Sequence, residues 1–134
     1  MSTKGNDWFL GFQNAEPPEC RRPVELAFDG EVPGDLRGTL YRVGPGQFEV
    51  YGERHNHWFD GDGLATAVRF TDEGVTWSSR FVQSEGKQRE DEEGRRIYGV
   101  FGSRPAGGPL RRFKNRVFKN VGNTNLIQHR HTLW

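Results

Sequence analysis

The stretch HWFDGDGLATAVRFTDEGVTWSSRFV, residues 57–82, contains the pattern that decides the fold. Asp60-Gly61-Asp62-Gly63 is turn chemistry, and it leads into a strand-like run at residues 64–70. A second turn signal, Asp72-Glu73-Gly74, separates that run from residues 75–82. In residues 75–82 most apolar side chains occupy alternate positions, as on one face of a strand. Two such runs joined by a short glycine-containing turn predict an antiparallel meander.

The residues before this stretch predict an arm and two further strands. Residues 1–37 contain several prolines, which withhold backbone donors, so we expect an irregular lead-in arm. Residues 36–43 predict a strand, which Gly44-Pro45-Gly46 is expected to break. The polar and apolar alternation of residues 47–51 then predicts a half-buried strand.

The residues after it continue the same rhythm. Residues 83–96 are charged and poor in apolar anchors, which predicts a partly helical excursion. Residues 97–102 and 121–127 are strand-like, residues 111–117 are expected to form a short basic helix, and residues 129–131 are expected at a hairpin tip. No apolar stripe with helical period runs for more than two turns, so the predicted fold is mostly β.

The composition excludes several classes of protein. No stretch of the 134 residues approaches the ~18–20 apolar residues of a membrane-spanning helix, and the 13% aromatic content argues against wholesale disorder. The single cysteine, Cys20, excludes a disulfide framework and a cysteine zinc site and fits a reducing compartment. The first residues have no basic segment followed by an apolar run, so we expect no signal peptide and a cytoplasmic protein.

The near-neutral net charge of +1 hides an asymmetry. All the acidic residues lie in residues 1–93, whereas residues 94–134 contain nine lysines and arginines and no acid. Such a basic segment could contact an anionic membrane surface or nucleic acid. We favour the simpler interpretation that its acidic counterparts lie elsewhere in the folded protein, and we expect no nucleic-acid partner, because the bases alternate with glycine and proline.

Two imidazoles and two carboxylates, His55, His57, Asp60 and Asp62, lie within eight residues of sequence. A divalent ion would accept these ligands, but their spacing fixes no coordination geometry. The favoured alternative is that Asp60 and Asp62 accept hydrogen bonds from amides of their own turn.

Three other features have weaker chemical interpretations. His129 and His131 form a second His-x-His pair, which is expected at a solvent-exposed tip rather than around a metal. Cys20 has no histidine nearby in the sequence and is expected to be a free thiol. The basic stretch 111–119 is interrupted by phenylalanines, for which anchoring in a core is the favoured role over base stacking.

Five stretches, in the same order and with similar spacing, resemble the carotenoid cleavage oxygenase family, and most closely its bacterial apocarotenoid-cleaving dioxygenase branch. The stretches are residues 38–48, 57–63, 80–82, 98–108 and 119–125. Each motif alone is weak, but five in register are strong, and the likeness covers residues ~6–134. The apolar pair Leu133-Trp134, which follows an expected turn, also suggests an unfinished strand and therefore an N-terminal fragment.

The resemblance implies a fold and a chemistry. Residues 1–134 would be the N-terminal portion of a single seven-bladed β-propeller, with residues 1–37 as the arm and 38–134 as the first blade strands and connecting loops. The family holds Fe(II) on the propeller axis with four histidines and uses O2 to cleave an alkene into two carbonyl products. Its substrates are apolar polyenes or stilbenes, so peripheral contact with a membrane is also implied.

The resemblance assigns one residue of this chain to the surroundings of the iron. Thr124 matches the residue that faces the open side of the metal, and it is not a ligand. The histidine ligands of the family correspond to positions beyond Trp134, so we expect no catalytic residue and no metal ligand in residues 1–134, and no activity from these residues alone. The alternative from another class is a short non-catalytic β module that binds a membrane surface or an acidic partner through residues 94–134.

Overall fold

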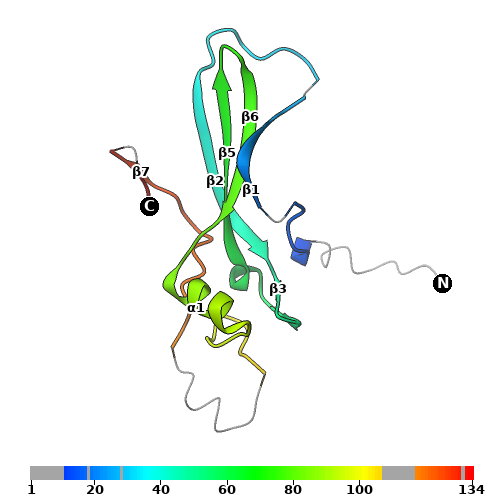
Figure 1. Ribbon diagram of the computed structural model, residues 1–134, viewed down its shortest axis with the longest axis vertical. Helices are drawn as coiled ribbons and strands as arrows, with labels where there is room; N and C mark the ends of the chain where they lie inside the picture. The colour runs from blue at the N-terminus through cyan, green and yellow to red at the C-terminus, as the bar shows by residue number, and fades with distance from the viewer. Residues whose placement is uncertain (1–10, 18, 28, 107–116, 131) are drawn as a thin grey trace, which may run out of the picture.

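The computed structural model describes residues 11–17, 19–27, 29–106, 117–130 and 132–134. Figure 1 shows a long, narrow sheet with the helix at its lower end and a small hairpin to one side. The strands are β1 (Cys20–Glu25), β2 (Gly38–Gln47), β3 (Glu49–Val50), β4 (Glu53–Arg54), β5 (Asp62–Thr71), β6 (Gly74–Phe81), β7 (Gln128–His129) and β8 (Thr132–Leu133); a 3-10 turn, η2 (Trp58–Asp60), and a helix, α1 (Glu85–Glu93), complete the elements.

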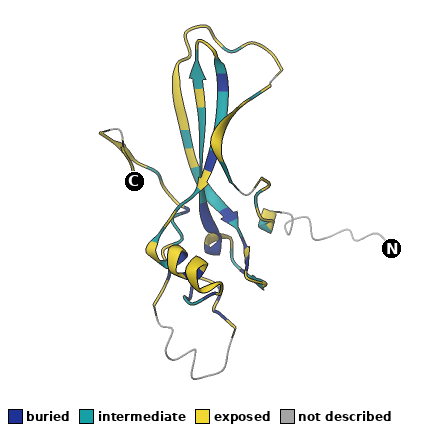
Figure 2. Cartoon of the chain, in the orientation of Figure 1, coloured by how far each residue is buried: buried dark blue, intermediate teal, exposed yellow. Residues whose placement is uncertain are grey.

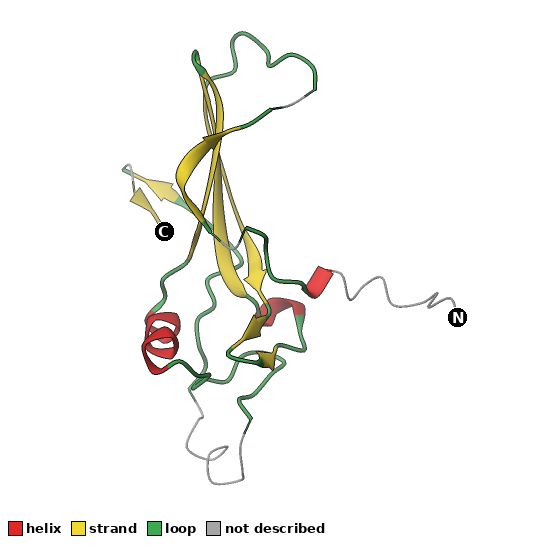
Figure 3. Ribbon diagram, turned by 45° about the vertical axis from the view of Figure 1, so that its right-hand side comes forward, coloured by secondary structure: helices red, strands yellow, loops and turns green. Residues whose placement is uncertain are grey.

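The main sheet is antiparallel, with the strand order β1-β6-β5-β2. β5 pairs with β6 from Leu64↔Phe81 to Thr71↔Gly74, and this hairpin confirms the meander predicted for residues 64–70 and 75–82. On its other side β5 pairs with β2 along almost its whole length. Figure 3 shows the twist that such a long antiparallel sheet develops.

The prediction that Gly44-Pro45-Gly46 ends the first strand was wrong. β2 continues through these residues to Gln47, and the register against β5 shifts between Pro45 and Gln47. β2 is an edge strand, where a proline does not interrupt the hydrogen bonds of a central ladder. The motif therefore produces a bulge instead of a strand end.

The expectation that residues 1–37 are irregular was also wrong in part, because β1 lies within them. Its pairing with β6 begins at Cys20↔Ser79 and resumes, after a register shift, at Val24↔Trp77. Glu19 assists by accepting a hydrogen bond from the amide of Phe81 (2.8 Å). Because β1 adds to the sheet at an edge, its one proline, Pro23, is tolerated.

The later part of the chain is less regular than its strand-like composition suggests. Residues 97–102 form no named strand and contribute an isolated bridge, Gly99↔Phe118, while residues 121–127 run without strand pairing. The expected helix at 111–117 lies, except for its last residue, outside the described residues. The excursion at 83–96 is confirmed as partly helical, since Ser84 caps α1 at its start and Gly94 ends it in the left-handed region.

The predicted hairpin near residues 129–131 is confirmed as β7–β8. Arg130 turns the chain with a φ of 47°, and beyond the strands the backbones of Ile127 and Trp134 exchange two hydrogen bonds of 2.9 Å. The Trp134 side chain is 75% exposed. His131 lies outside the described residues.

The core lies at the lower end of the sheet, where Figure 2 shows the buried positions gathering next to α1. The ring of Phe48, 1% exposed, packs between Phe12 and Trp58 with centroid distances of 5.2 and 5.5 Å. These contacts dock the end of the N-terminal arm onto the sheet. Among the described residues, no helix has the length and apolar character needed to cross a membrane.

Candidate functional site

The candidate site is the place where the turn at residues 59–63 meets the segment at residues 119–125, here called the junction. The Asn123 side-chain amide donates to the carbonyl oxygens of Phe59 (3.1 Å) and Gly61 (2.8 Å), and the Gly63 amide donates to Val121 O (2.8 Å). Two of the sequence motifs that carry the family resemblance are therefore joined directly.

Gly63 is required at the junction because the two backbones approach too closely for any side chain. A Cβ at this position would lie 2.2 Å from the carbonyl oxygen of Gly122, which cannot rotate away. Gly122 itself has a φ of +63°, and a Cβ there would lie 2.7 Å from Cγ1 of Val82. The two glycines thus let the segment at 119–125 lie directly against the first residues of β5.

Asp60 does not cap its own turn, so that prediction was wrong. Its carboxylate is fully buried and accepts hydrogen bonds from the Gly102 amide (2.8 Å) and the Ser103 hydroxyl (2.5 Å). The Ser103 hydroxyl in turn accepts a hydrogen bond from the Asn56 amide (2.7 Å). Asp60 therefore anchors the loop around residue 102 to the turn.

Asp62 also differs from the prediction, because it forms ion pairs with distant lysines. Its Oδ1 lies 2.6 Å from Lys119 Nζ and its Oδ2 lies 3.8 Å from Lys87 Nζ. Lys119 Nζ also lies 2.8 Å from Oε2 of Glu90 on α1. These four side chains, all nearly inaccessible to solvent, form what we call the ion cluster: Asp62, Lys87, Glu90 and Lys119.

The two buried carboxylates of the ion cluster respond to it differently. Burial raises the pKa of Asp62 above its ordinary value even though both lysines oppose this shift. Burial also acts to raise the pKa of Glu90, but hydrogen bonds from Lys119 and from the amides of Tyr98 and Ile97 lower it below its ordinary value overall. The cluster therefore favours the ionised form of Glu90, which is the form that pairs with the Lys119 ammonium.

His55 lies beside the ion cluster and is 1% exposed. Burial, then the charges of Arg96 and Lys119, lowers the pKa of His55 to about 4, so the ring is neutral near pH 7. Neither ring nitrogen has a hydrogen-bond partner among the described residues. His55 is therefore a buried neutral ring.

His57 has a different structural role from His55, and the two rings do not form a metal site together among the described residues. It caps η2, with its Nδ1 accepting a hydrogen bond from the Phe59 amide (3.1 Å). Its ring also packs on Phe101 and Phe59, at centroid distances of 4.8 and 5.3 Å. Both of these phenylalanines are largely exposed.

The described residues do not form an iron site. Within them, no group of three or more histidine, cysteine, aspartate or glutamate side chains is placed to hold a metal ion. The carboxylates of Asp60 and Asp62 are already engaged by Ser103 and by lysines. The ligands that the resemblance implies thus remain a prediction for residues beyond this chain.

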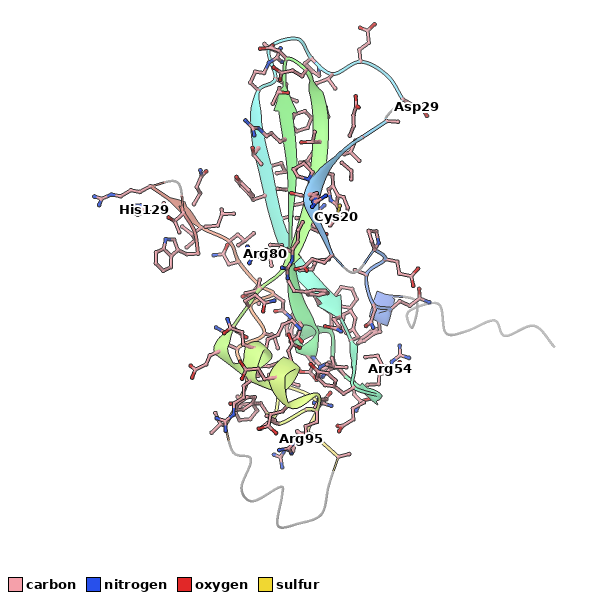
Figure 4. The ribbon with its side chains drawn as sticks, in the orientation of Figure 1. Cys20, Asp29, Arg54, Arg80, Arg95 and His129 are labelled. Atoms are coloured by element: carbon pink, nitrogen blue, oxygen red, sulfur yellow. The ribbon has the colours of Figure 1, made fainter. Side chains whose placement is uncertain are left out.

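The remaining candidate residues from the sequence, His129, Cys20 and Thr124, lie in three different parts of the structure. Figure 4 shows His129 on the hairpin, far from the lower end of the sheet, and Cys20 on β1. The Cys20 thiol donates to the carbonyl oxygen of Arg22 (3.1 Å). Thr124, the residue expected near the iron, follows Asn123 directly and is exposed.

Sequence reasoning missed the ion cluster and the role of Asn123. Lys119 and Asp62 belong to two separate motifs, and no local pattern pairs residues so far apart. The available signal was indirect: residues 83–96 are poor in apolar anchors, so a helix there has to attach through polar groups. Lys87 and Glu90 are the buried residues of α1.

Comparison with known proteins identifies the family. The family model described as RPE65, retinal pigment epithelial membrane protein, matches residues 14–134, and the chain belongs to this carotenoid oxygenase family. It is 45% identical over 122 residues to the apocarotenoid-15,15'-oxygenase of Synechocystis, covering 90% of this chain and 24% of that protein. It is 31% identical over 106 residues to human beta,beta-carotene 15,15'-dioxygenase, covering 79% of this chain and 19% of that protein.

The fold agrees with the sequence relationship. A solved structure of the Synechocystis apocarotenoid oxygenase, a Glu150Asp mutant, matches with a TM-score of 0.83 and 43% identity, covering 95% of this chain and 26% of that one. The mostly β prediction and the family resemblance are confirmed, and the fold is part of that of a β-propeller enzyme. The chain spans about a quarter of the length of these Synechocystis relatives.

Proposed function

We propose that residues 1–134 are the N-terminal portion of a non-haem Fe(II) dioxygenase that cleaves an alkene bond of an apocarotenoid or carotenoid into two carbonyl products. The observation that carries this proposal is the shared fold and 43–45% identity with an apocarotenoid oxygenase over nearly the whole chain. The substrate is an apolar polyene, and the co-substrate is O2. A stilbene is the second substrate class to test.

Within that enzyme this chain supplies structure around the metal rather than ligands to it. When bound, iron supplies the activation of O2 that alkene cleavage requires. The junction holds residues 119–125 against the turn at 59–63. Thr124, which follows Asn123 in this segment, would lie near the metal, where its small side chain would help to limit access. Residues 1–134 alone are inactive in this proposal, because the four histidine ligands lie elsewhere in the protein.

Location and membrane contact form part of the same proposal. The enzyme acts in the cytoplasm, which agrees with its single, free cysteine. It takes its apolar substrate from a membrane surface by peripheral contact. Vesicle co-sedimentation of the full-length oxygenase tests that contact.

The alternative of a binding module that uses the basic residues of 94–134 needs those residues to be free, and three of them are engaged within the chain. Lys119 is buried between two carboxylates, Arg96 is 2% exposed and contacts Glu53, and Arg95 pairs with Glu93. These three bases have acidic partners within the chain, whereas Arg111, Arg112, Lys114 and Arg116 lie outside the described residues, so the role of the whole segment 94–134 stays a prediction.

The proposal is tested with the full-length oxygenase, purified and supplied with Fe(II). Incubation with an apocarotenal under 18O2 should give two carbonyl products, resolved by chromatography with mass detection, with label from O2 in the products. His129→Gln is the matched control and should keep this activity, because His129 lies on an exposed hairpin. An iron-loaded enzyme that leaves apocarotenoids, carotenoids and stilbenes intact would overturn the proposal.

A further inference from the structure

The Lys119 side chain is the centre of the ion cluster. It is 1% exposed and bridges Asp62, the first residue of β5, and Glu90 on α1, whose side chains are each 2% exposed. Lys119 itself belongs to the segment at 119–125. One ammonium group therefore links three parts of the chain that are far apart in sequence.

Stability alone does not explain a buried cluster of this kind. Removing charges from water carries a desolvation penalty that their mutual attraction does not always offset, and apolar residues of similar volume often stabilise equally well. A fully connected buried polar network does, however, select one arrangement of the elements that it joins. Glu90 is fully connected in this sense, because its second oxygen accepts hydrogen bonds from the backbone amides of Ile97 and Tyr98. Asp62, by contrast, is held among the described residues by its ion pairs with Lys119 and Lys87 alone.

The remaining contacts show which element the cluster arranges. The segment at 119–125 has no strand pairing. Its start is held by the Lys119 side chain and by the Lys119 backbone amide, which donates to the carbonyl oxygen of Gly99 (3.0 Å), and it is held further along by Asn123, which donates to Gly61 and Phe59. Between them it touches the sheet through the hydrogen bond from Gly63 to Val121. An irregular segment with so few contacts depends on each of them for its position.

We propose that Lys119 is a positioning residue of the oxygenase: its bridge between Asp62 and Glu90 fixes the segment at 119–125 on the junction and thereby sets the location of Thr124. This inference rests on the proposed function, which is what gives the location of Thr124 a catalytic consequence. Lys119 touches neither substrate nor metal in this scheme, and it acts through the segment that it anchors.

The first test needs no iron and no activity. Hydrogen–deuterium exchange is measured on the iron-free full-length oxygenase, comparing Lys119→Met with Lys87→Met, which removes a charge from the same cluster but not from the segment. Lys119→Met should make peptides covering 59–63 and 117–125 exchange about tenfold faster, while Lys87→Met changes them by less than about twofold. Lys119→Arg should restore part of the protection.

The second test uses the iron-loaded enzyme and an apocarotenal. Lys119→Met should lower kcat by about tenfold and leave KM within about twofold of wild type. A displaced Thr124 would disturb the geometry of the reacting groups more than it weakens substrate binding. The signal of the iron–nitric oxide adduct in electron paramagnetic resonance should also change. Arg95→Met, which breaks an exposed ion pair with Glu93, is the control and should keep the wild-type kcat.

The outcomes separate the two proposals. Unchanged exchange at 117–125 in Lys119→Met overturns the inference whatever the activity, and faster exchange with wild-type kcat and spectrum overturns it as well. If the wild-type enzyme shows no iron-dependent cleavage, the proposed function fails, while the exchange result still decides whether Lys119 anchors the segment. Should Lys119→Met fail to fold, Asn123→Ala, which leaves no buried charge, should show the same pattern.

Discussion

Replacing Gly63 with alanine should push apart the two backbones that form the junction. The added Cβ would lie 2.2 Å from the carbonyl oxygen of Gly122 and 2.8 Å from that of Val121. Both are backbone atoms, so no rotamer change relieves the overlap. Gly63 also cannot retreat freely, because its own carbonyl accepts a hydrogen bond from the Val82 amide (2.8 Å).

The size of the effect follows from these contacts. Overpacking a tight site typically costs about 1–3 kcal/mol. Separating the backbones also removes the hydrogen bond from Gly63 to Val121, worth about 1 kcal/mol net. Gly63→Ala should therefore lower the free energy of unfolding of the full-length oxygenase by about 2–4 kcal/mol.

The assay is urea unfolding, with Gly44→Ala as the matched control. Gly44 is also a strand glycine, but a Cβ there meets nothing within 4 Å and its φ is not positive. The control should change stability by less than about 0.5 kcal/mol. If Gly63→Ala were as stable as Gly44→Ala, the close approach of the segment to β5 would be refuted.

Three further predictions follow from other features. Ser103→Ala should destabilise the full-length oxygenase by about 2 kcal/mol in urea unfolding, because the buried Asp60 carboxylate loses a donor; an effect below about 0.5 kcal/mol would argue against this bond. Burial lowers the pKa of His55 from 6.5 to about 4. The free energy of unfolding therefore has its full value above pH 6.5 and falls by up to about 3 kcal/mol as the pH drops toward 4, because the unfolded state takes up the proton more readily. His55→Leu should flatten this dependence, measured by unfolding at each pH, and His129→Gln should leave it unchanged; equal slopes in the two variants would contradict the assignment. Isolated 1–134 should show no cooperative urea transition by circular dichroism, because only four apolar side chains of its described residues are buried; a sharp two-state transition would show that it folds alone.

Local patterns predicted the parts of the fold that local physics determines. Residues 64–70 and 75–82 alternate around a short turn, and the hairpin β5–β6 follows from that pattern alone. The partly helical excursion at residues 83–96, which contains α1, was predicted from its charge and its lack of apolar anchors. The order and spacing of the five motifs together predicted the family, although none of the motifs is specific alone.

The parts that sequence could not predict depend on distant partners. Turn chemistry assigned Asp60 and Asp62 to local amides, whereas the fold offers Asp60 the Ser103 hydroxyl and Asp62 the Lys119 ammonium. Residues 97–102 have strand-like composition, but a strand also needs a neighbouring edge, and the described residues supply a single bridge there. The role of Thr124 stays a prediction, since it is defined relative to a metal whose ligands we expect outside residues 1–134.

We propose that the oxygenase to which this chain belongs holds its iron with ligands that lie outside residues 1–134. The most direct measurement is the iron content of the purified full-length oxygenase and of its four single histidine-to-glutamine variants, at His55, His57, His129 and His131. We expect iron in a one-to-one ratio with the protein in the wild type and in every variant that folds. A wild type that binds no iron, or a folded variant that loses it, would contradict this proposal.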